Sequence, residues 1–119
     1  MPLFLLGLLL ASALNLTPIT VANRALLADA DNALVLFFSP YCPHCQRFRP
    51  TYLQLGTKLN HDNLLFADVD CTVERPLCAQ FKIRAYPTVL FVSKGLTADV
   101  FRGPRTVENL LAFVENNIQ

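Results

Sequence analysis

Charge is scarce in this sequence. Ten lysines and arginines stand against nine acidic residues, and charged side chains make up 16% of the 119 residues, where about a quarter is usual. The net charge of +1 excludes the basic surface that nucleic-acid binding needs. Tryptophan, internal repeats, linkers and low-complexity tracts are all missing from the sequence. The hydrophobic content of 53% excludes a disordered chain, and the length provides for one domain with one core.

Residues 1–23 contain no charged side chain at all. An apolar run from Leu3 to Leu10 leads to Ala11-Ser12-Ala13, the small-x-small pattern that signal peptidase favours. The run is too short for a membrane span, which needs about 20 residues. We therefore predict a signal peptide at 1–13, a single domain at 14–119 and no stable membrane span. Because the usual Lys or Arg before the run is missing, a buried first element of the domain and an uncleaved anchor are alternatives.

From Asn23 onward, short β-rich runs alternate with helical patterns, which predicts the α/β class and the order β-α-β-α-β-α-β-β-α. The run from Ala33 to Ser39 is continuously apolar, as expected of a central strand buried on both faces. Further strands are expected at 64–70, 88–93 and 97–101, with a turn at Lys94-Gly95-Leu96. A short helix is expected after Asn23, which would cap it, and a longer one from the Cys42 segment to Leu59, with a kink at Pro50. A third helix is expected to start at Thr72 or Pro76, and the last is expected to run from its cap at Thr106 to Ile118.

Two cysteines, Cys42 and Cys45, are separated by two residues directly after the central strand and at the start of a helix. The spacing permits a disulfide within one helical turn, and the unpaired N–H groups of a helix N-terminus favour ionisation of the Cys42 thiol. Only a thiolate attacks a disulfide. Pro43 removes a backbone donor where it is dispensable, and His44 can bring a positive charge or a hydrogen bond to the sulfur. The pattern predicts a redox-active pair whose nucleophile is Cys42.

Cys45 lies one turn deeper in the helix and is predicted to be the resolving thiol, which attacks the mixed disulfide formed at Cys42 and releases the partner. Two other interpretations of this pair are a structural disulfide without turnover and half of a zinc site. A zinc knuckle usually needs a second closely spaced pair, whereas Cys71 and Cys78 are seven positions apart. The predicted chemistry requires no metal ion and no organic cofactor.

Four segments resemble the thioredoxin-fold domains of the protein disulfide isomerase family: LVLFFSPYCPHCQRFRP (34–50), ADVDC (67–71), RAYPT (84–88) and FRGPR (101–105). The resemblance extends over roughly Leu16 to Ile118 and implies a thioredoxin fold with a central mixed β-sheet flanked by helices. The family site usually reads WCGHC, and here Tyr41 and Pro43 replace its tryptophan and glycine. A Pro-His pair between the cysteines is similar to that of the strongly oxidising bacterial enzyme DsbA.

The resemblance also implies roles outside the cysteine pair. Tyr86-Pro87-Thr88 matches the family's cis-proline loop, so substrate contacts are implied at Tyr41, Tyr86 and Pro87. On sequence alone, only about 5% of X-Pro bonds are cis, and an ordinary proline at a strand start is the alternative. Arg105 matches an arginine that moves toward the site and eases deprotonation of the resolving cysteine, with a solvated arginine before a helix as the alternative.

One departure from the family concerns a buried acid. The family usually places Glu or Asp six residues before the first cysteine, where it relays protons to the second, and this chain has Leu36 there. The lysine that commonly pairs with that acid is also missing, since Asp68 stands at the corresponding place. Losing both together is coherent because a buried unpaired charge is costly. Proton transfer at Cys45 is therefore placed in doubt.

A second cysteine pair is formed by Cys71, at the end of a strand, and Cys78, on the following helix. A turn can close this separation into a disulfide, and some family members carry cysteines in this loop. In an oxidising compartment we predict a structural disulfide, with two reduced buried thiols or a second redox pair as alternatives.

The predicted function is that of a protein disulfide isomerase or oxidase of the secretory pathway, located in the endoplasmic reticulum lumen or secreted. It forms or rearranges disulfides in client polypeptides through the Cys42/Cys45 cycle, acts as a monomer and needs a reoxidant that the sequence does not identify. A thioredoxin-like reductant and a client-binding chaperone module without turnover are the rival interpretations. The final residues carry no Lys-Asp-Glu-Leu type signal, so retention and secretion are both open.

Overall fold

A computed structural model describes residues 15–119 and shows a five-stranded mixed sheet, so the predicted signal peptide at 1–13 lies outside the described residues. The sheet order is β1-β3-β2-β4-β5. Strand β2 pairs in parallel with β3, which pairs in parallel with β1, whereas β4 runs antiparallel to both β2 and β5. The strands are β1 (Thr17–Pro18), β2 (Asn32–Phe38), β3 (Leu64–Asp70), β4 (Thr88–Ser93) and β5 (Leu96–Val100).

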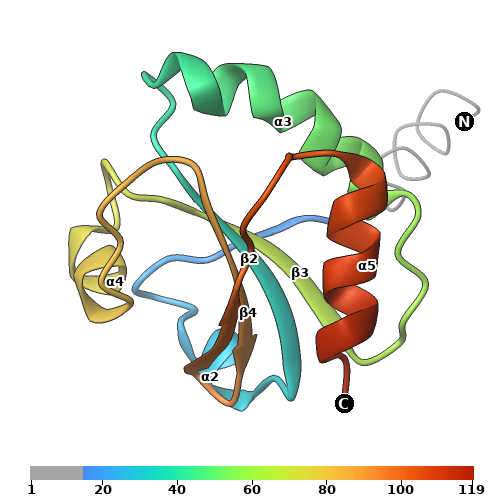
Figure 1. The fold of residues 1–119 in the computed structure, drawn as a ribbon. Helices are drawn as coiled ribbons and strands as arrows, with labels where there is room; N and C mark the ends of the chain where they lie inside the picture. The colour runs from blue at the N-terminus through green and yellow to red at the C-terminus, as the bar shows by residue number, and fades with distance from the viewer. Residues whose placement is uncertain (1–14) are drawn as a thin grey trace, which may run out of the picture.

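Within residues 15–119, four helices cover the two faces of this sheet (Figure 1). Their bounds are α2 (Ala25–Asp29), α3 (Pro43–Gly56), α4 (Arg75–Gln80) and α5 (Val107–Asn117). Helices α2 and α4 contribute Leu27 and Leu77 to the core on one face, and α3 and α5 contribute Leu55 and Leu110 to the core on the other. The predicted class, the mixed sheet and the predicted element order are confirmed. Among residues 15–119, none of the helices has the length and apolar character needed to cross a membrane.

Strand β2 lies at the centre of the sheet, between β3 and β4, and it carries the site at its carboxyl end. Residues 32–37 are buried without interruption, which explains the unbroken apolar run from Ala33 onward. A strand covered on both faces has no polar side to alternate with the apolar one. The predicted central strand is therefore confirmed, shifted by one residue toward the N-terminus.

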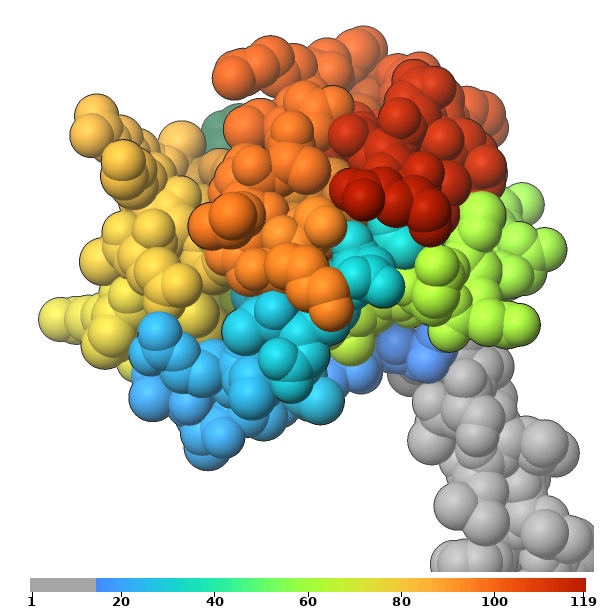
Figure 2. Space-filling view, turned by 90° about the horizontal axis from the view of Figure 1, so that it is seen from below, coloured from blue at the N-terminus to red at the C-terminus, as the bar shows by residue number. Residues whose placement is uncertain are grey.

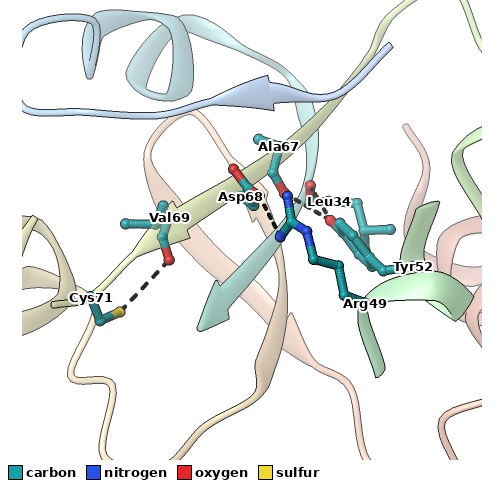
Figure 3. A network of polar contacts seen from close by, with 7 residues as sticks. All are labelled: Leu34, Arg49, Tyr52, Ala67, Asp68, Val69 and Cys71. Atoms are coloured by element: carbon teal, nitrogen blue, oxygen red, sulfur yellow. Dashed lines mark hydrogen bonds and ion pairs between the residues drawn. The ribbon is translucent and has the colours of Figure 1, made fainter. Parts of the chain in front are cut away.

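Tyr52 of α3 joins the two parallel strands beneath it (Figure 3). Its buried hydroxyl lies 3.1 Å from the carbonyl oxygen of Leu34 in β2 and 2.8 Å from that of Ala67 in β3. Burial, followed by the nearby charge of Asp68, raises the pKa of Tyr52 well above its usual value, so the hydroxyl keeps its proton. The aromatic ring packs against Phe66 at 4.6 Å between centroids. The two polar contacts and the ring contact hold α3 against β2 and β3.

Several helix ends differ from the predictions. Asn23 does not cap α2, because its side-chain oxygen accepts a 2.7 Å hydrogen bond from the Thr20 N–H and so closes the preceding turn instead. Helix α3 runs through Pro50 as predicted but ends at Gly56 rather than Leu59, since the Thr57 N–H turns back to Gln54 and Leu55. Helix α4 begins at Arg75, with Pro76 in its first turn.

Other predicted ends agree with the structure. The Thr106 hydroxyl accepts a 3.1 Å hydrogen bond from the Asn109 N–H and so caps α5, as predicted. The predicted hairpin is also present, and both Lys94 and Gly95 adopt positive φ in its turn.

At the end of the molecule opposite the start of α3, polar contacts join elements that are far apart in the sequence (Figures 1 and 2). Seen from below in Figure 2, α2, the start of β2, the β4–β5 turn and the end of α5 meet at this surface. Lys94 pairs with Asp31 at 3.2 Å, and the buried Asn32 accepts a 2.9 Å hydrogen bond from the Gln119 N–H. The first contact ties the β4–β5 turn to the start of the central strand, and the second holds the C-terminal residue against the same point.

Candidate functional site

The loop from Ser39 to Tyr41 carries the chain from β2 into α3. The Cys42 N–H donates to the Ser39 carbonyl at 3.1 Å, and the side-chain amide of Gln46 donates to the Pro40 carbonyl at 2.9 Å. Cys42 is the cap residue of α3 with extended backbone, and Pro43 occupies the first helical position, where its missing N–H costs nothing. The sequence thus fixes the first cysteine at the helix N-terminus.

The two thiols of this segment are free but differ in exposure. Cys42 is partly exposed, whereas Cys45 is only 5% exposed. The difference follows from the helix, because Cys45 lies on the face of α3 that turns toward the sheet, together with Phe48 and Tyr52. Only Cys42 is therefore open to attack by a large substrate.

The surroundings move the pKa values of the two thiols in opposite directions. The backbone N–H of Cys45 lowers the pKa of Cys42 most, and the N–H of His44 and the charge of Arg47 act the same way against partial desolvation. Burial raises the pKa of Cys45, which the nearby Cys42 raises further, while the backbone at Ser39 and the charge of Arg105 partly oppose it. The thiolate thus forms more readily at the partly exposed Cys42 than at the buried Cys45.

Arg47 lies beside His44, one turn along the exposed side of α3, and the sequence analysis missed it. One guanidinium nitrogen, Nη2, is 3.0 Å from Nδ1 of His44. Because a guanidinium can only donate, Nδ1 accepts, and the contact selects the tautomer with its proton on Nε2. Arg47 therefore supplies a fixed positive charge near Cys42, beside His44, for which the sequence predicted a positive charge or a hydrogen bond. The i, i+3 spacing of His44 and Arg47 is the sequence signal that could have revealed this pair.

The Tyr86–Pro87 loop lies against the first cysteine. The Tyr86 carbonyl oxygen is 3.8 Å from the Cys42 sulfur, within the range of a weak S–H hydrogen bond, and the Tyr86–Pro87 bond is cis. Pro87 is buried, Tyr86 is 38% exposed and Tyr41 is 80% exposed. The structure thus brings Tyr86 and Pro87 to the sulfur, and it leaves two exposed tyrosines on the segments that border it.

A cavity of about 250 Å³ lies beside Cys45. Leu36, Phe38 and Arg49 form part of its wall, and no carboxylate is among its lining residues in the described part of the chain. Leu36 stands where the family usually has its buried acid, so the space next to the resolving thiol is mostly apolar. This environment agrees with the raised pKa of Cys45.

An ion pair between a buried carboxylate and a partly exposed arginine joins the neighbouring strand to α3 (Figure 3). Asp68 of β3 is directly opposite Leu36 of β2 and is 4% exposed, and its carboxylate is 3.2 Å from Nη1 of Arg49. Burial raises the pKa of Asp68 although the charge of Arg49 opposes the shift. The region therefore holds a carboxylate and a positive charge after all, with the carboxylate on β3 and the guanidinium on α3. Arg49 also lines the cavity beside Cys45.

Arg105 lies on the other side of α3, in the loop that precedes α5. Its guanidinium carbon is 6.0 Å from the centre of the Phe48 ring, and the residue lines a recess together with His44 and Arg47. Its charge lowers the pKa of Cys45, although burial outweighs it. The position thus suits a residue that assists ionisation of the resolving thiol.

The other two cysteines are joined in a disulfide between Cys71, at the end of β3, and Cys78 of α4. Their Cα atoms are 5.7 Å apart, and both residues are buried. They belong to the core on the face opposite α3, where they pack with Phe81 and Ile83. This bond holds α4 against the sheet.

The thioredoxin family model matches residues 18–116. The chain belongs to the thioredoxin family. Its thioredoxin domain is 30% identical to the first thioredoxin domain of mouse protein disulfide-isomerase A4, with a TM-score of 0.78 over 88% of this chain and 76% of that one. The resemblance to the protein disulfide isomerases that the sequence analysis drew from four segments is thereby confirmed.

Curated relatives of this thioredoxin-family chain are much longer than it is. It is 31% identical to a thioredoxin domain-containing protein 5 homolog of Drosophila melanogaster over 92% of this chain and 26% of the relative. It is 34% identical to protein disulfide-isomerase A4 of Bos taurus over 75% of this chain and 14% of the relative. The chain thus spans about a quarter or less of these proteins and corresponds to one of their domains.

Proposed function

We propose that the chain is a thiol-disulfide oxidoreductase of the protein disulfide isomerase type, acting on polypeptide clients in the secretory pathway, in the endoplasmic reticulum lumen or outside the cell. The observation that carries this proposal is the contrast within one helical turn between a partly exposed Cys42 with a lowered pKa and a buried Cys45 with a raised pKa. Such a contrast suits one sulfur to attack and the other to resolve.

The oxidising cycle begins with a Cys42–Cys45 disulfide and a client thiolate. The client sulfur attacks the Cys42 sulfur, the intramolecular S–S bond breaks, and Cys45 leaves as a thiolate that takes up a proton. A second client thiolate then attacks the client sulfur of the mixed disulfide, and Cys42 leaves as a thiolate. The client loses two electrons and the enzyme pair gains them. An oxidant of the disulfide class restores the starting state, and isomerisation uses the same steps from the reduced pair.

The surrounding residues would support these steps in separate ways. The helix N-terminus, begun by Pro43, and the charge of Arg47 held on His44 stabilise the Cys42 thiolate when it leaves. The Arg105 charge favours ionisation of Cys45 during resolution. The exposed Tyr41 and the Tyr86–Pro87 loop would form the surface on which an extended client segment lies.

The nucleophile assignment predicts the order of alkylation in the reduced protein. Cys42 should react with iodoacetamide well before Cys45 near neutral pH, and the midpoint of its pH–rate profile should lie at a lower pH than that of a free cysteine. The lowered pKa gives this direction, because the thiolate fraction is then complete at a lower pH. Arg47→Gln should move the profile toward higher pH. Mass spectrometry of quenched samples measures the order, and labelling of Cys45 as fast as Cys42 would contradict the assignment.

If the chain oxidises its clients, the Cys42–Cys45 pair should have a high reduction potential. A thiolate stabilised at Cys42 favours the reduced form, so we expect a potential between about −180 mV, as for protein disulfide isomerase, and about −120 mV, as for DsbA. Pro43→Gly should lower it. Equilibration with glutathione buffers measures both values. A potential near the −270 mV or so of thioredoxin would instead support the reductant.

A further inference from the structure

A recess of about 190 Å³ lies beside α3, and His44, two residues after the first cysteine, is among its lining residues. Its lining residues are His44, Arg47, Phe48 and Thr51 from the first turns of α3, and Arg105 from the loop before α5. The recess is therefore built by two segments that are far apart in the sequence. It is separate from the cavity beside Cys45, with which it shares no lining residue.

The charge in this recess is positive and has no internal partner. Among residues 15–119, the ion pairs involve Arg49 with Asp68, His61 with Glu115 and Lys94 with Asp31, so neither arginine of the recess meets a carboxylate. No acidic residue lines the recess either. Two guanidinium groups that face one space without a counter-ion leave that space suited to an anion.

Each arginine of the recess contacts another of its lining side chains. Arg47 donates to His44 at 3.0 Å, and the Arg105 guanidinium carbon lies 6.0 Å from the centre of the Phe48 ring. A guanidinium has five N–H donors, so each group keeps donors for a ligand after making its contact. The hydroxyl of Thr51 adds one more donor to the wall. These groups match the planar, two-oxygen geometry of a carboxylate.

The recess also lies within electrostatic reach of the reacting sulfurs. The charge of Arg47 acts on Cys42 and that of Arg105 acts on Cys45. His44 and Arg47 line the recess and follow Cys42 by two and five residues on α3, so a substrate whose sulfur meets Cys42 places its neighbouring groups at the recess.

We propose that the recess formed by His44, Arg47, Thr51 and Arg105 over Phe48 binds a carboxylate of the thiol or disulfide substrate, close in its sequence to the reacting sulfur. This inference rests on the proposed exchange function and assigns it a substrate preference. Two sources supply this chemistry: an acidic side chain beside a client cysteine, and the carboxylates of glutathione. Thiol-disulfide exchange at Cys42 follows the same steps as in the cycle described above.

The test compares exchange rates of the reduced full chain with matched disulfide substrates. One arm uses three peptides that differ only beside the cysteine, where they carry Glu, Gln or Lys. The other arm uses glutathione disulfide and its neutral ester. In the arm that supplies the natural ligand we expect the acidic substrate to react about fivefold faster than the neutral one, which is the upper range for an exposed ion pair. The ratio should fall toward one as salt is raised.

Variants assign the preference to the recess. The double variant Arg47→Gln/Arg105→Gln should bring the acidic-to-neutral ratio close to one, and the ratio is used because the absolute rates also depend on thiolate formation. Arg102→Gln is the matched control, since Arg102 is exposed, lies three residues before Arg105 and does not line the recess. It should retain the wild-type rates and ratio.

The outcomes separate this inference from the function on which it rests. Acid preference in the peptide arm alone identifies the client side chain, and preference in the glutathione arm alone identifies glutathione. Normal exchange with equal rates for acidic and neutral substrates in both arms overturns the subsite and leaves the function intact. A preference that survives in the double variant also overturns it. Absence of exchange with every substrate overturns the proposed function and the subsite together.

Discussion

A Cys42→Ser variant should lose thiol-disulfide exchange by a factor on the order of a thousand or more, as expected when a covalent nucleophile is removed. Cys42 is the partly exposed thiol of the pair, and the N-terminal backbone of α3 lowers its pKa. Cys45 cannot take its place, because it is buried and its pKa is raised. Insulin reduction and refolding of reduced ribonuclease measure the loss in the two directions.

Cys45→Ser is the matched variant for this experiment. It keeps the nucleophile but lacks the resolving sulfur, so mixed disulfides between Cys42 and clients should accumulate and be visible on non-reducing gels. Exchange that persists in Cys42→Ser would show that the pair is not the reacting group. If the chain binds clients without turnover, the wild type and both variants should give the same result in these assays.

Removing the second disulfide should lower the free energy of unfolding by about 2–3 kcal/mol. The Cys71–Cys78 bond closes a short loop with a separation of seven residues, so it restricts the unfolded chain less than a long loop would. Both residues are also buried in the core beside α4, where replacement by alanine leaves space for a sulfur atom on each side. Urea denaturation of Cys71→Ala/Cys78→Ala against the wild type measures the difference.

Exchange activity is the control for this double variant. The bond lies on the opposite face of the sheet from α3, so the rate at Cys42 should stay within about twofold of the wild-type rate. Alkylation of the oxidised wild type without reduction should leave Cys71 and Cys78 unmodified. Modification of both thiols, or loss of exchange in the double variant, would argue against a structural role.

The sequence allowed accurate prediction where local patterns decide the structure. Strands β3 and β4 have the predicted bounds, because their apolar runs are closed by turn residues on both sides. The cap at Thr106 was predictable for a similar reason, since its hydroxyl satisfies a backbone donor three residues away. Asn23 has the same capping chemistry, but its oxygen is taken by Thr20, and a pattern cannot decide between two such local partners.

The electrostatics of the site were harder to predict because they depend on contacts across the fold. The replacement at Leu36 was visible in the sequence, and it suggested that the buried charges had been lost. Asp68 and Arg49 are 19 positions apart and meet only when α3 packs across β3. Nothing in their spacing indicates that pair. Arg47 contacts His44 on its own helix, and a check of i, i+3 positions would have found this pair.

The central position of β2 has a consequence for the motions that this domain can make. Its backbone is hydrogen-bonded on both edges, by β3 and by β4, and Tyr52 binds its carbonyl at Leu34 from above. Amide protons of such a strand exchange with solvent only through the largest cooperative openings, whereas β1 and β5 at the sheet edges open at lower cost. Opening of the edge strands therefore does not displace β2, the strand that leads into the dithiol loop. The geometry between Cys42 and the carbonyl of Tyr86 then depends on two neighbouring strands, β2 and β4, that open together.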